Sequence, residues 1–432
     1  MADLQNFLQP NNSEMAIGLD LCDDYSQISY VMLNSNNAET LISNGAEGNL
    51  LIPTALFKRS EVNQWFAGRE AVRNKDEEGY FIENLVSLAK EGENVEIGDE
   101  VFAPHALLAL YIKRILSLVN VVAPVHKIVS FMITVPVLDQ KMVNALNKAV
   151  SSLGLKTNNI SFQSHMESFY YYMLYQSPDL WKRDVLLLHA DGECLKSYRM
   201  ETNKNTTPVV VFIEENVFPV KDLHLTQSEI GQMRLSDIDS AVSNYAEKLV
   251  SERIFSAIYL IGDSFKGDWY KETQKIICRK ARVFQGNNLF SKGAAFSAKN
   301  KVNPTVVSDG HVFLGDDKLK SNVGMNVLRQ GENSYLALLD AGVNWYEAGK
   351  ECDLILNDDN RLSFVVTPLT GKNPVIDQII LDGLPTRPNK TTRVHVSMRM
   401  EDQNHLAINI QDLGFGELFP ATDLEWNEVI SV

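Results

Sequence analysis

The first strongly patterned stretch of the chain is residues 17–31, with the sequence IGLDLCDDYSQISYV. An apolar run leads to Asp20, a short polar segment follows, and a second run then alternates apolar and polar residues. Alternation of this kind on both sides of a few turn-forming residues is typical of two antiparallel strands joined by a tight turn. The pattern predicts a β-hairpin near the start of the chain, with an acidic side chain at the end of its first strand.

Strand and helix patterns then follow one another up to residue 172. The predicted elements are a strand at 50–58, a strand turning into a helix within 64–71, a helix at 105–119, a buried strand at 126–135 closed by Pro136, a helix at 141–153 ended by Gly154, a strand at 160–162 and a helix at 166–172. The last helix carries aromatic residues at 169–172, where closely packed helices need small side chains. We therefore expect a wider helix crossing or a displaced helix there.

The middle of the chain repeats the opening pattern. Residues 184–195 are predicted to form a second strand, turn and strand, and residues 257–261 a strand that ends at Gly262. The other predicted elements of this region are strands at 208–214 and 217–223, a helix at 235–251 and a helix that includes 288–295.

The pattern changes again after residue 312. Helical spacing disappears, and short alternating runs separated by Gly, Asn, Asp and Pro take its place. This texture is typical of a β-sandwich. We therefore expect a C-terminal domain of antiparallel strands.

Composition narrows the class of protein. The chain has 432 residues, 45% of them apolar and 22% charged, which is long enough for about two to four domains. Its formal net charge of −15 argues against nucleic acid or an anionic membrane as a main partner. No apolar run reaches the roughly 18 residues of a membrane span, and the first residues lack the features of a signal peptide. We expect a cytoplasmic protein without a targeting segment.

The cysteines give no sign of a metal site. Cys22, Cys194, Cys278 and Cys352 are far apart, and none has a His or Cys partner at metal-ligand spacing. Because zinc sites usually show such spacing, no metal is expected. Reduced thiols in a cytosol fit this pattern best.

Several stretches together resemble the 70-kDa heat-shock chaperones. The hairpin with Asp20, the second hairpin at 184–195 and the strand ending at Gly262 are similar, in order, to the nucleotide-binding elements of actin-like ATPases. Residues 379–388 (IILDGLPTRP), followed by two strands at matching spacing, resemble the substrate-binding β-sandwich of that chaperone family. The resemblance implies an α/β, two-lobed actin-like ATPase fold with ribonuclease-H-like lobes, followed by an antiparallel β-sandwich.

The resemblance also implies domain boundaries. They are lobe I at 13–165, lobe II at 166–305, a linker at 306–320 and the sandwich at 321–432. The interval 198–257 is much shorter than its counterpart in the family, so lobe II is expected to lack the upper helical subdomain that clamps adenine. The family's C-terminal helical lid is not expected either.

The nucleotide-binding elements are degenerate in this sequence. A turn that cradles phosphate needs Gly for close backbone approach and Ser or Thr as a donor, whereas acids stand in all three elements, where they would repel a phosphate. The degenerate positions are Cys22, Asp23 and Asp24 in the first element, His189, Asp191, Gly192 and Glu193 in the second, and Gly262 and Asp263 in the third.

Two carboxylates, Asp20 and Glu167, match the family's magnesium site and are interpreted as remnants of it, although Asp20 could also be only a turn former. The leading hypothesis is a pseudo-ATPase that acts as a peptide- or protein-binding scaffold without a cofactor. The alternative is a divergent but active ATP-dependent chaperone that uses Asp20 and Glu167 with ATP and magnesium.

The sandwich is the region expected to bind a partner. In the family a peptide crosses this domain, and the resemblance places the floor of its central pocket at Phe364 and a wall at Leu328. Phe364 is larger than the valine of the family and would fill the pocket; alternatively it is an ordinary core residue. Under either interpretation we expect weak binding of generic apolar peptides and recognition of a dedicated protein or peptide partner through the sandwich surface.

Overall fold

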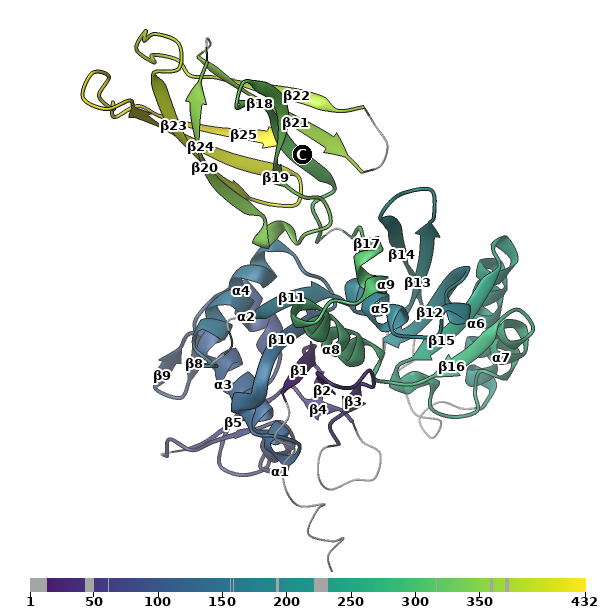
Figure 1. Ribbon diagram of the computed structural model, residues 1–432. Helices are drawn as coiled ribbons and strands as arrows, with labels where there is room; N and C mark the ends of the chain where they lie inside the picture. Colours follow the sequence, from purple (N-terminus) through teal and green to yellow (C-terminus); the bar gives the residue numbers. More distant parts are fainter. Residues whose placement is uncertain are drawn as a thin grey trace, which may run out of the picture. The chain divides into compact units, whose positions relative to one another are not determined.

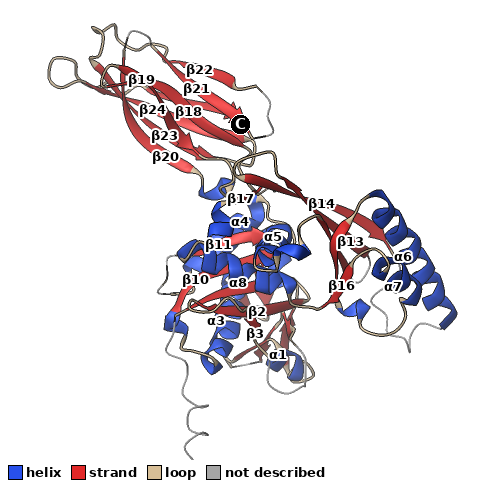
Figure 2. Ribbon diagram, turned by 45° about the vertical axis from the view of Figure 1, so that its right-hand side comes forward, coloured by secondary structure: helices blue, strands red, loops and turns tan. Residues whose placement is uncertain are grey.

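The computed structural model describes residues 14–42, 50–60, 62–155, 157, 159–191, 194–220, 232–315, 317–357, 360–369 and 373–432 (Figure 1). The chain divides into two compact units, Met1–Val312 and Phe313–Val432. The first unit mixes helices and sheets, whereas strands dominate the second (Figure 2). The boundary falls where helical spacing ends in the sequence.

One sheet of the first unit is built around the predicted hairpin. Its strands are β1 (Met15–Leu21), β2 (Tyr25–Met32), β3 (Glu39–Thr40), β4 (Ile52–Pro53), β10 (Ile128–Val135) and β11 (Ile160–Ser164). The order is β11-β10-β1-β2-β3, with β4 also paired to β2; β11, β10 and β1 are parallel, and β1, β2 and β3 are antiparallel. All seven residues of β1 are buried, which explains its continuous apolar run. The hairpin prediction is confirmed.

A second sheet repeats this arrangement. Its strands are β12 (Asp184–Asp191), β13 (Cys194–Asn203), β14 (Val209–Pro219), β15 (Phe255–Ile261), β16 (Arg282–Gln285) and β17 (His311–Phe313). The order is β16-β15-β12-β13-β14-β17; β16, β15 and β12 are parallel, and β12, β13 and β14 are antiparallel. Both sheets therefore contain two parallel strands, then a hairpin, then a further antiparallel strand, in the same chain order.

The interval between β13 and β15 differs from its prediction. The sequence predicts strands at 208–214 and 217–223, but one long β14 passes through Asn216, which pairs with Ser197 of β13. Pairing with the long β13 outweighs the low strand propensity of the polar residues in the middle. Residues 221–223 of the second predicted strand lie outside the described residues. The described part of this interval otherwise holds α6 (Gln232–Glu252), which confirms the helix predicted at 235–251.

Helices cover both sheets. On the second sheet, α6 and α7 (Lys271–Cys278) pack together, and Val242 and Ala246 of α6 share a core with Leu186 and Leu188 of β12. On the first sheet, α8 (Leu289–Val302) lies against β1, β2 and β10. Gly18 permits this contact, because a Cβ there would lie 2.2 Å from the backbone nitrogen of Ala295.

The wide helix crossing expected from the aromatic residues at 169–172 is wrong. Helix α5 (His165–Leu174) packs directly on α8, and a Cβ on Gly293 of α8 would lie 1.9 Å from the Ser168 carbonyl oxygen of α5. The aromatic side chains fit around this contact: Tyr171 and Tyr172 pack against a cluster that includes Phe296 of α8, and Tyr172 also meets Tyr259 of β15 edge-on at 5.9 Å. The small residues at the contact set the helix separation, not their aromatic neighbours.

The remaining elements of the first unit are short. They are β5 (Leu56–Arg59), β6 (Trp65–Ala67), β7 (Gly79–Ile82), β8 (Val95–Ile97), β9 (Glu100–Phe102), α1 (Arg69–Arg73), α2 (Leu85–Glu91), α3 (Pro104–Leu116), α4 (Gln140–Ser151) and α9 (Val306–Asp309). The predicted strand at 50–58 is divided into β4 and β5. Among the described residues, no helix combines the length and apolar character needed to cross a membrane.

The second unit contains two four-stranded antiparallel sheets. One has the order β19 (Glu332–Leu339), β18 (Ser321–Arg329), β21 (Arg361–Pro368), β22 (Val375–Ile380), and the other β20 (Gly349–Leu356), β23 (Thr392–Met400), β24 (His405–Gly414), β25 (Glu425–Ser431). Burial alternates along β21, β23 and β24, so each sheet turns one apolar face into a core.

Candidate functional site

The carboxyl ends of three parallel strands, β11, β10 and β1, meet at one edge of the first sheet. Asp20 lies at this edge, in register with Thr134 of β10, which in turn pairs with Gln163 of β11. His165 comes directly after β11, at the start of α5. This edge is where α/β sheets commonly hold ligands and reactive side chains.

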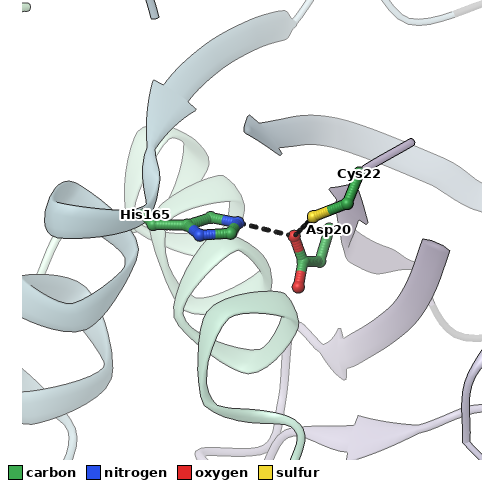
Figure 3. A group of neighbouring side chains, drawn as sticks. All are labelled: Asp20, Cys22 and His165. Atoms are coloured by element: carbon green, nitrogen blue, oxygen red, sulfur yellow. Dashed lines mark hydrogen bonds and ion pairs between the residues drawn. The ribbon is translucent and has the colours of Figure 1, made fainter. Parts of the chain in front are cut away.

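Asp20 and His165 form a buried pair (Figure 3). Nε2 of His165 lies 2.8 Å from Oδ1 of Asp20, and the two side chains are 2% and 4% exposed. Ser164 caps α5 by accepting the backbone N–H of Glu167 at 3.3 Å, which holds His165 at the first position of the helix. The junction between β11 and α5 therefore points an imidazole at the acid of the first hairpin.

Cys22 completes a group of three. Its Sγ lies 3.7 Å from the same Oδ1 of Asp20, and its backbone N–H closes the hairpin turn by donating to the Tyr25 carbonyl at 2.9 Å. One oxygen, one sulfur and one nitrogen, from Asp20, Cys22 and His165, lie within 4.8 Å of one another. We call these three residues the DCH cluster.

The second hairpin reaches this cluster through Phe290 of α8. The Phe290 ring stacks on His165 with 3.9 Å between centroids, and it meets the His189 ring edge-on at 5.5 Å. The two imidazole rings are 6.5 Å apart, and His189 is buried in β12. His189 therefore packs beside the cluster as part of an aromatic group.

Glu167 is near this edge of the sheet but is not a member of the DCH cluster. It is buried in the first turn of α5, two residues beyond His165. Burial, then the neighbouring Tyr171 and the charge of Glu167, raise the pKa of Tyr170 above its ordinary value. The group that gathers around Asp20 thus contains His165, which the sequence analysis passed over, and not the second carboxylate expected there.

Asp23 does not have the position expected of a residue facing phosphate. Its Oδ1 accepts the backbone N–H groups of Val86 and Ser87, at 2.9 and 3.0 Å, at the start of α2. The carboxylate therefore caps a helix from a distant part of the chain, where a negative charge is favourable. Asp24 is exposed, and its backbone carbonyl accepts the Thr54 N–H at 3.2 Å.

The third predicted element keeps a glycine for packing and uses its acid at the surface. Gly262 has a φ of 104°, and a Cβ there would lie 2.2 Å from the Ala190 carbonyl oxygen of β12. Asp263 accepts hydrogen bonds from Asn287 Nδ2 at 2.7 Å and from Lys266 Nζ at 2.8 Å. Gly262 thus lets β15 end close to β12, and Asp263 is bound to its own neighbours.

The turn of the second hairpin is not among the described residues. Asp191 ends β12 and pairs with Cys194 of β13. Gly192 and Glu193 lie outside the described residues. The expectations for these two positions stay predictions.

Phe364 and Leu328 lie on opposite faces of one sheet of the second unit. Phe364 is fully buried, whereas Leu328 is 54% exposed. Gly324 of β18 pairs with Val365 of β21, so Leu328, an even number of residues from Gly324, shares the face of Val365 and not that of Phe364. The two therefore do not line one pocket, contrary to the expectation, and Phe364 is a core residue.

A buried ion pair joins the two parts of the sequence phrase that resembles the chaperone sandwich. Arg387 holds both carboxylate oxygens of Asp412, at 2.7 and 2.8 Å, and the side chains are 5% and 0% exposed. Asp412 also accepts from the Gly414 N–H and from Thr422. Burial alone would raise the pKa of Asp412, but Arg387 and the other donors outweigh it and hold that pKa well below its usual range.

Comparison with known protein families follows the division into units. Residues 37–316 match the model of a family of unknown function, DUF5716, C-terminal, and this match covers more than half of the chain. The chain belongs to this family. Residues 318–432 match a domain of unknown function, DUF8552. The chain matches no curated protein. In this DUF5716 member, the DCH cluster lies partly outside the matched region, because Asp20 and Cys22 precede residue 37.

Sequence reasoning missed two residues of the site, His165 and Phe290. His165 is 145 residues from Asp20, so no local pattern joins them. A signal was nevertheless present. Asp20 and His165 each stand at or just after the carboxyl end of a predicted strand, and parallel strands bring such positions to the same edge. Phe290 carried no comparable signal, since its role depends on how α8 crosses the sheet.

Proposed function

We propose that this chain is a chaperone-like protein of the 70-kDa heat-shock type that no longer turns over ATP and serves as a protein-binding scaffold. The shared strand order of the two sheets of the first unit supports an actin-like pair of lobes, since an internal duplication of this kind is what the resemblance implies. The two antiparallel sheets of the second unit fit the substrate-binding part of such a protein.

The pairing of Asp20 with His165 carries the proposal. In an actin-like ATPase the acid at this position must be free to orient a water on a magnesium ion. Here its Oδ1 is hydrogen-bonded to a buried imidazole at 2.8 Å, beneath the Phe290 ring. Because the carboxylate is engaged and almost fully buried, it is poorly suited to that task.

Other features support the same conclusion. Asp23 is committed to capping α2, and Asp263 to Asn287 and Lys266. These elements have taken on structural roles in which a phosphate would compete with existing hydrogen bonds. Phosphate binding is therefore opposed by these hydrogen bonds as well as by charge repulsion.

The outer face of the β19-β18-β21-β22 sheet supports a protein partner. The Tyr335 ring lies over Gly324, where a Cβ would approach the ring to 2.3 Å. Gly324 pairs with Val365, and Val365 with Ile376, so an apolar row crosses the sheet. Tyr335 and Ile376 are 49% and 59% exposed. Exposed apolar side chains that gather in this way are typical of interaction surfaces.

A second candidate, a divergent active ATP-dependent chaperone, retains one observation in its favour. Asp20 and Glu167 are both buried at or near the carboxyl edge of the first sheet, where the catalytic carboxylates of such an enzyme would lie. Titration with magnesium and ATP, described next, separates the two candidates.

The test is isothermal titration of the full chain with ATP in the presence of magnesium, alongside an assay of phosphate release. The expected result is no saturable binding and no turnover above a blank. Micromolar binding with phosphate release would overturn the proposal in favour of the active chaperone. Fluorescence anisotropy with a labelled leucine-rich heptapeptide tests the sandwich, where we expect no tight binding because Phe364 fills the core.

A further inference from the structure

We infer that the DCH cluster is a binding site for a divalent transition-metal ion, with Zn²⁺ the best match. This inference goes beyond the proposed function. It shares Asp20 and His165 with the pair that supports that proposal, but Cys22 plays no part in the proposal and no nucleotide is involved. It rests on the donor atoms, their spacing and the way the fold holds them.

The donor set selects the class of metal. A thiolate, an imidazole and a carboxylate are the three side-chain ligands that zinc uses most. Calcium and magnesium require six or more oxygen ligands, whereas the cluster offers a single carboxylate. The soft sulfur of Cys22 therefore favours zinc and its neighbours over the hard cations.

Side-chain shifts on the order of 1 Å or less would bring the cluster to tetrahedral spacing. Zinc bond lengths of about 2.0–2.3 Å separate neighbouring ligand atoms by about 3.3–3.7 Å. The Cys22 sulfur and the Asp20 oxygen are 3.7 Å apart, and the nitrogen and sulfur belong to a group within 4.8 Å. The His165 nitrogen is 2.8 Å from the Asp20 oxygen, so this one gap must open by about 0.5 Å to admit the ion.

The fold holds two of the ligands firmly and leaves the third partly open. Asp20 is paired on both sides, with Gln27 of β2 and Thr134 of β10, and the His165 ring is stacked on Phe290. Cys22 is half-buried in the hairpin turn. Three protein ligands with one accessible side is the arrangement in which zinc keeps a fourth position for water or a substrate atom.

The competing interpretation is a buried Asp20–His165 pair with an unrelated thiol beside it. The two interpretations differ in one measurable property. A metal site requires the sulfur and the imidazole to act on the same ion, whereas the pair alone has no use for Cys22.

In the experiment, the full chain is first treated with a chelator, the chelator is removed, and Co²⁺ is then added. Co²⁺ takes zinc sites and reports thiolate ligation through a charge-transfer band in the near ultraviolet. We expect one equivalent to produce the band, Zn²⁺ to abolish it, and millimolar Mg²⁺ to leave it unchanged. Absence of the band in the wild type would overturn the inference.

Variants then assign the ligands. Cys22→Ser should remove the band, and His165→Gln should weaken Zn²⁺ binding by at least about 100-fold, judging from the 10–100-fold cost of losing even an outer-shell partner. Cys352→Ser and His395→Gln in the second unit are matched controls and should bind Zn²⁺ as the wild type does. Unchanged Zn²⁺ binding in Cys22→Ser and His165→Gln would also overturn the inference.

A measurement on the wild type guards against variants that fail to fold. Alkylation of each thiol by iodoacetamide is followed by mass spectrometry with and without Zn²⁺. Zn²⁺ should slow the modification of Cys22 at least tenfold and leave that of the exposed Cys278 unchanged. Equal alkylation of Cys22 with and without Zn²⁺ would count against the site.

Discussion

The two units each bury an acid next to a base, and the two pairs differ in almost every other respect. In the second unit, Asp412 receives two bonds from an arginine that is always charged, and further donors from Gly414 and Thr422. In the first, one oxygen of Asp20 contacts a histidine and a thiol. The Arg387–Asp412 pair has all its hydrogen bonds satisfied and stabilises the fold. The carboxylate of Asp20, beside an imidazole and a thiol, can still bind a ligand or a proton.

The largest effect is expected from Arg387→Ala. Breaking a buried, bidentate ion pair leaves the Asp412 charge without its main partner, and such losses cost about 3–5 kcal/mol of unfolding free energy. Urea denaturation combined with hydrogen exchange in β24 would measure it. Arg393→Ala, which removes an exposed arginine of the adjacent β23, is the control and should cost less than about 0.5 kcal/mol. Equal losses of unfolding free energy in both variants would mean that the Arg387–Asp412 pair does not stabilise the fold.

A smaller effect is expected from His165→Ala. The buried carboxylate of Asp20 loses its close partner and keeps only the weak Cys22 thiol as a donor, and an under-satisfied buried group costs about 1–3 kcal/mol. The matched control is His395→Ala, because His395 contacts Asp353 at the same 2.8 Å but at the surface. Thermal unfolding should show a clear loss for the first variant and almost none for the second. A similar loss in both would show that burial does not distinguish the pairs.

Part of the acid dependence of stability should come from the Asp412 pair. Because the folded pKa of Asp412 is held below that of the unfolded chain, the unfolded state binds more protons in acid. The contribution is therefore complete above about pH 4 and is lost as the pH falls further. Urea midpoints between pH 5 and pH 2.5 should decline in the wild type and be flatter in Arg387→Ala. Parallel declines would contradict the assignment.

The smallest effect is expected from nucleotide. A ligand present at 100 times its dissociation constant adds about 2.7 kcal/mol to stability. Millimolar ATP with magnesium should leave the melting temperature unchanged, because the first-hairpin acid is already paired with His165. A rise of several degrees would show that the chain still binds nucleotide and would contradict this prediction.

Local patterns were sufficient for most of the secondary structure. Both hairpins, the helices near 105–119 and 235–251, and the strand texture after residue 312 follow from spacing and turn residues alone. The errors arose where partners decide the outcome. Strand β14 continues through polar residues because β13 pairs with it, and α5 approaches α8 closely because Ser168 meets Gly293.

The candidate site divides in the same way. The sequence by itself determined that an acid would lie at the end of the first strand and that a tight polar turn would follow it, because both depend on residues close together in the chain. Only the tertiary structure decided that His165, 145 residues away, would pair with that acid, and that Asp23 would turn aside to cap α2. Parallel strands and helix crossings bring distant side chains within contact distance, and a linear pattern does not encode which of them meet.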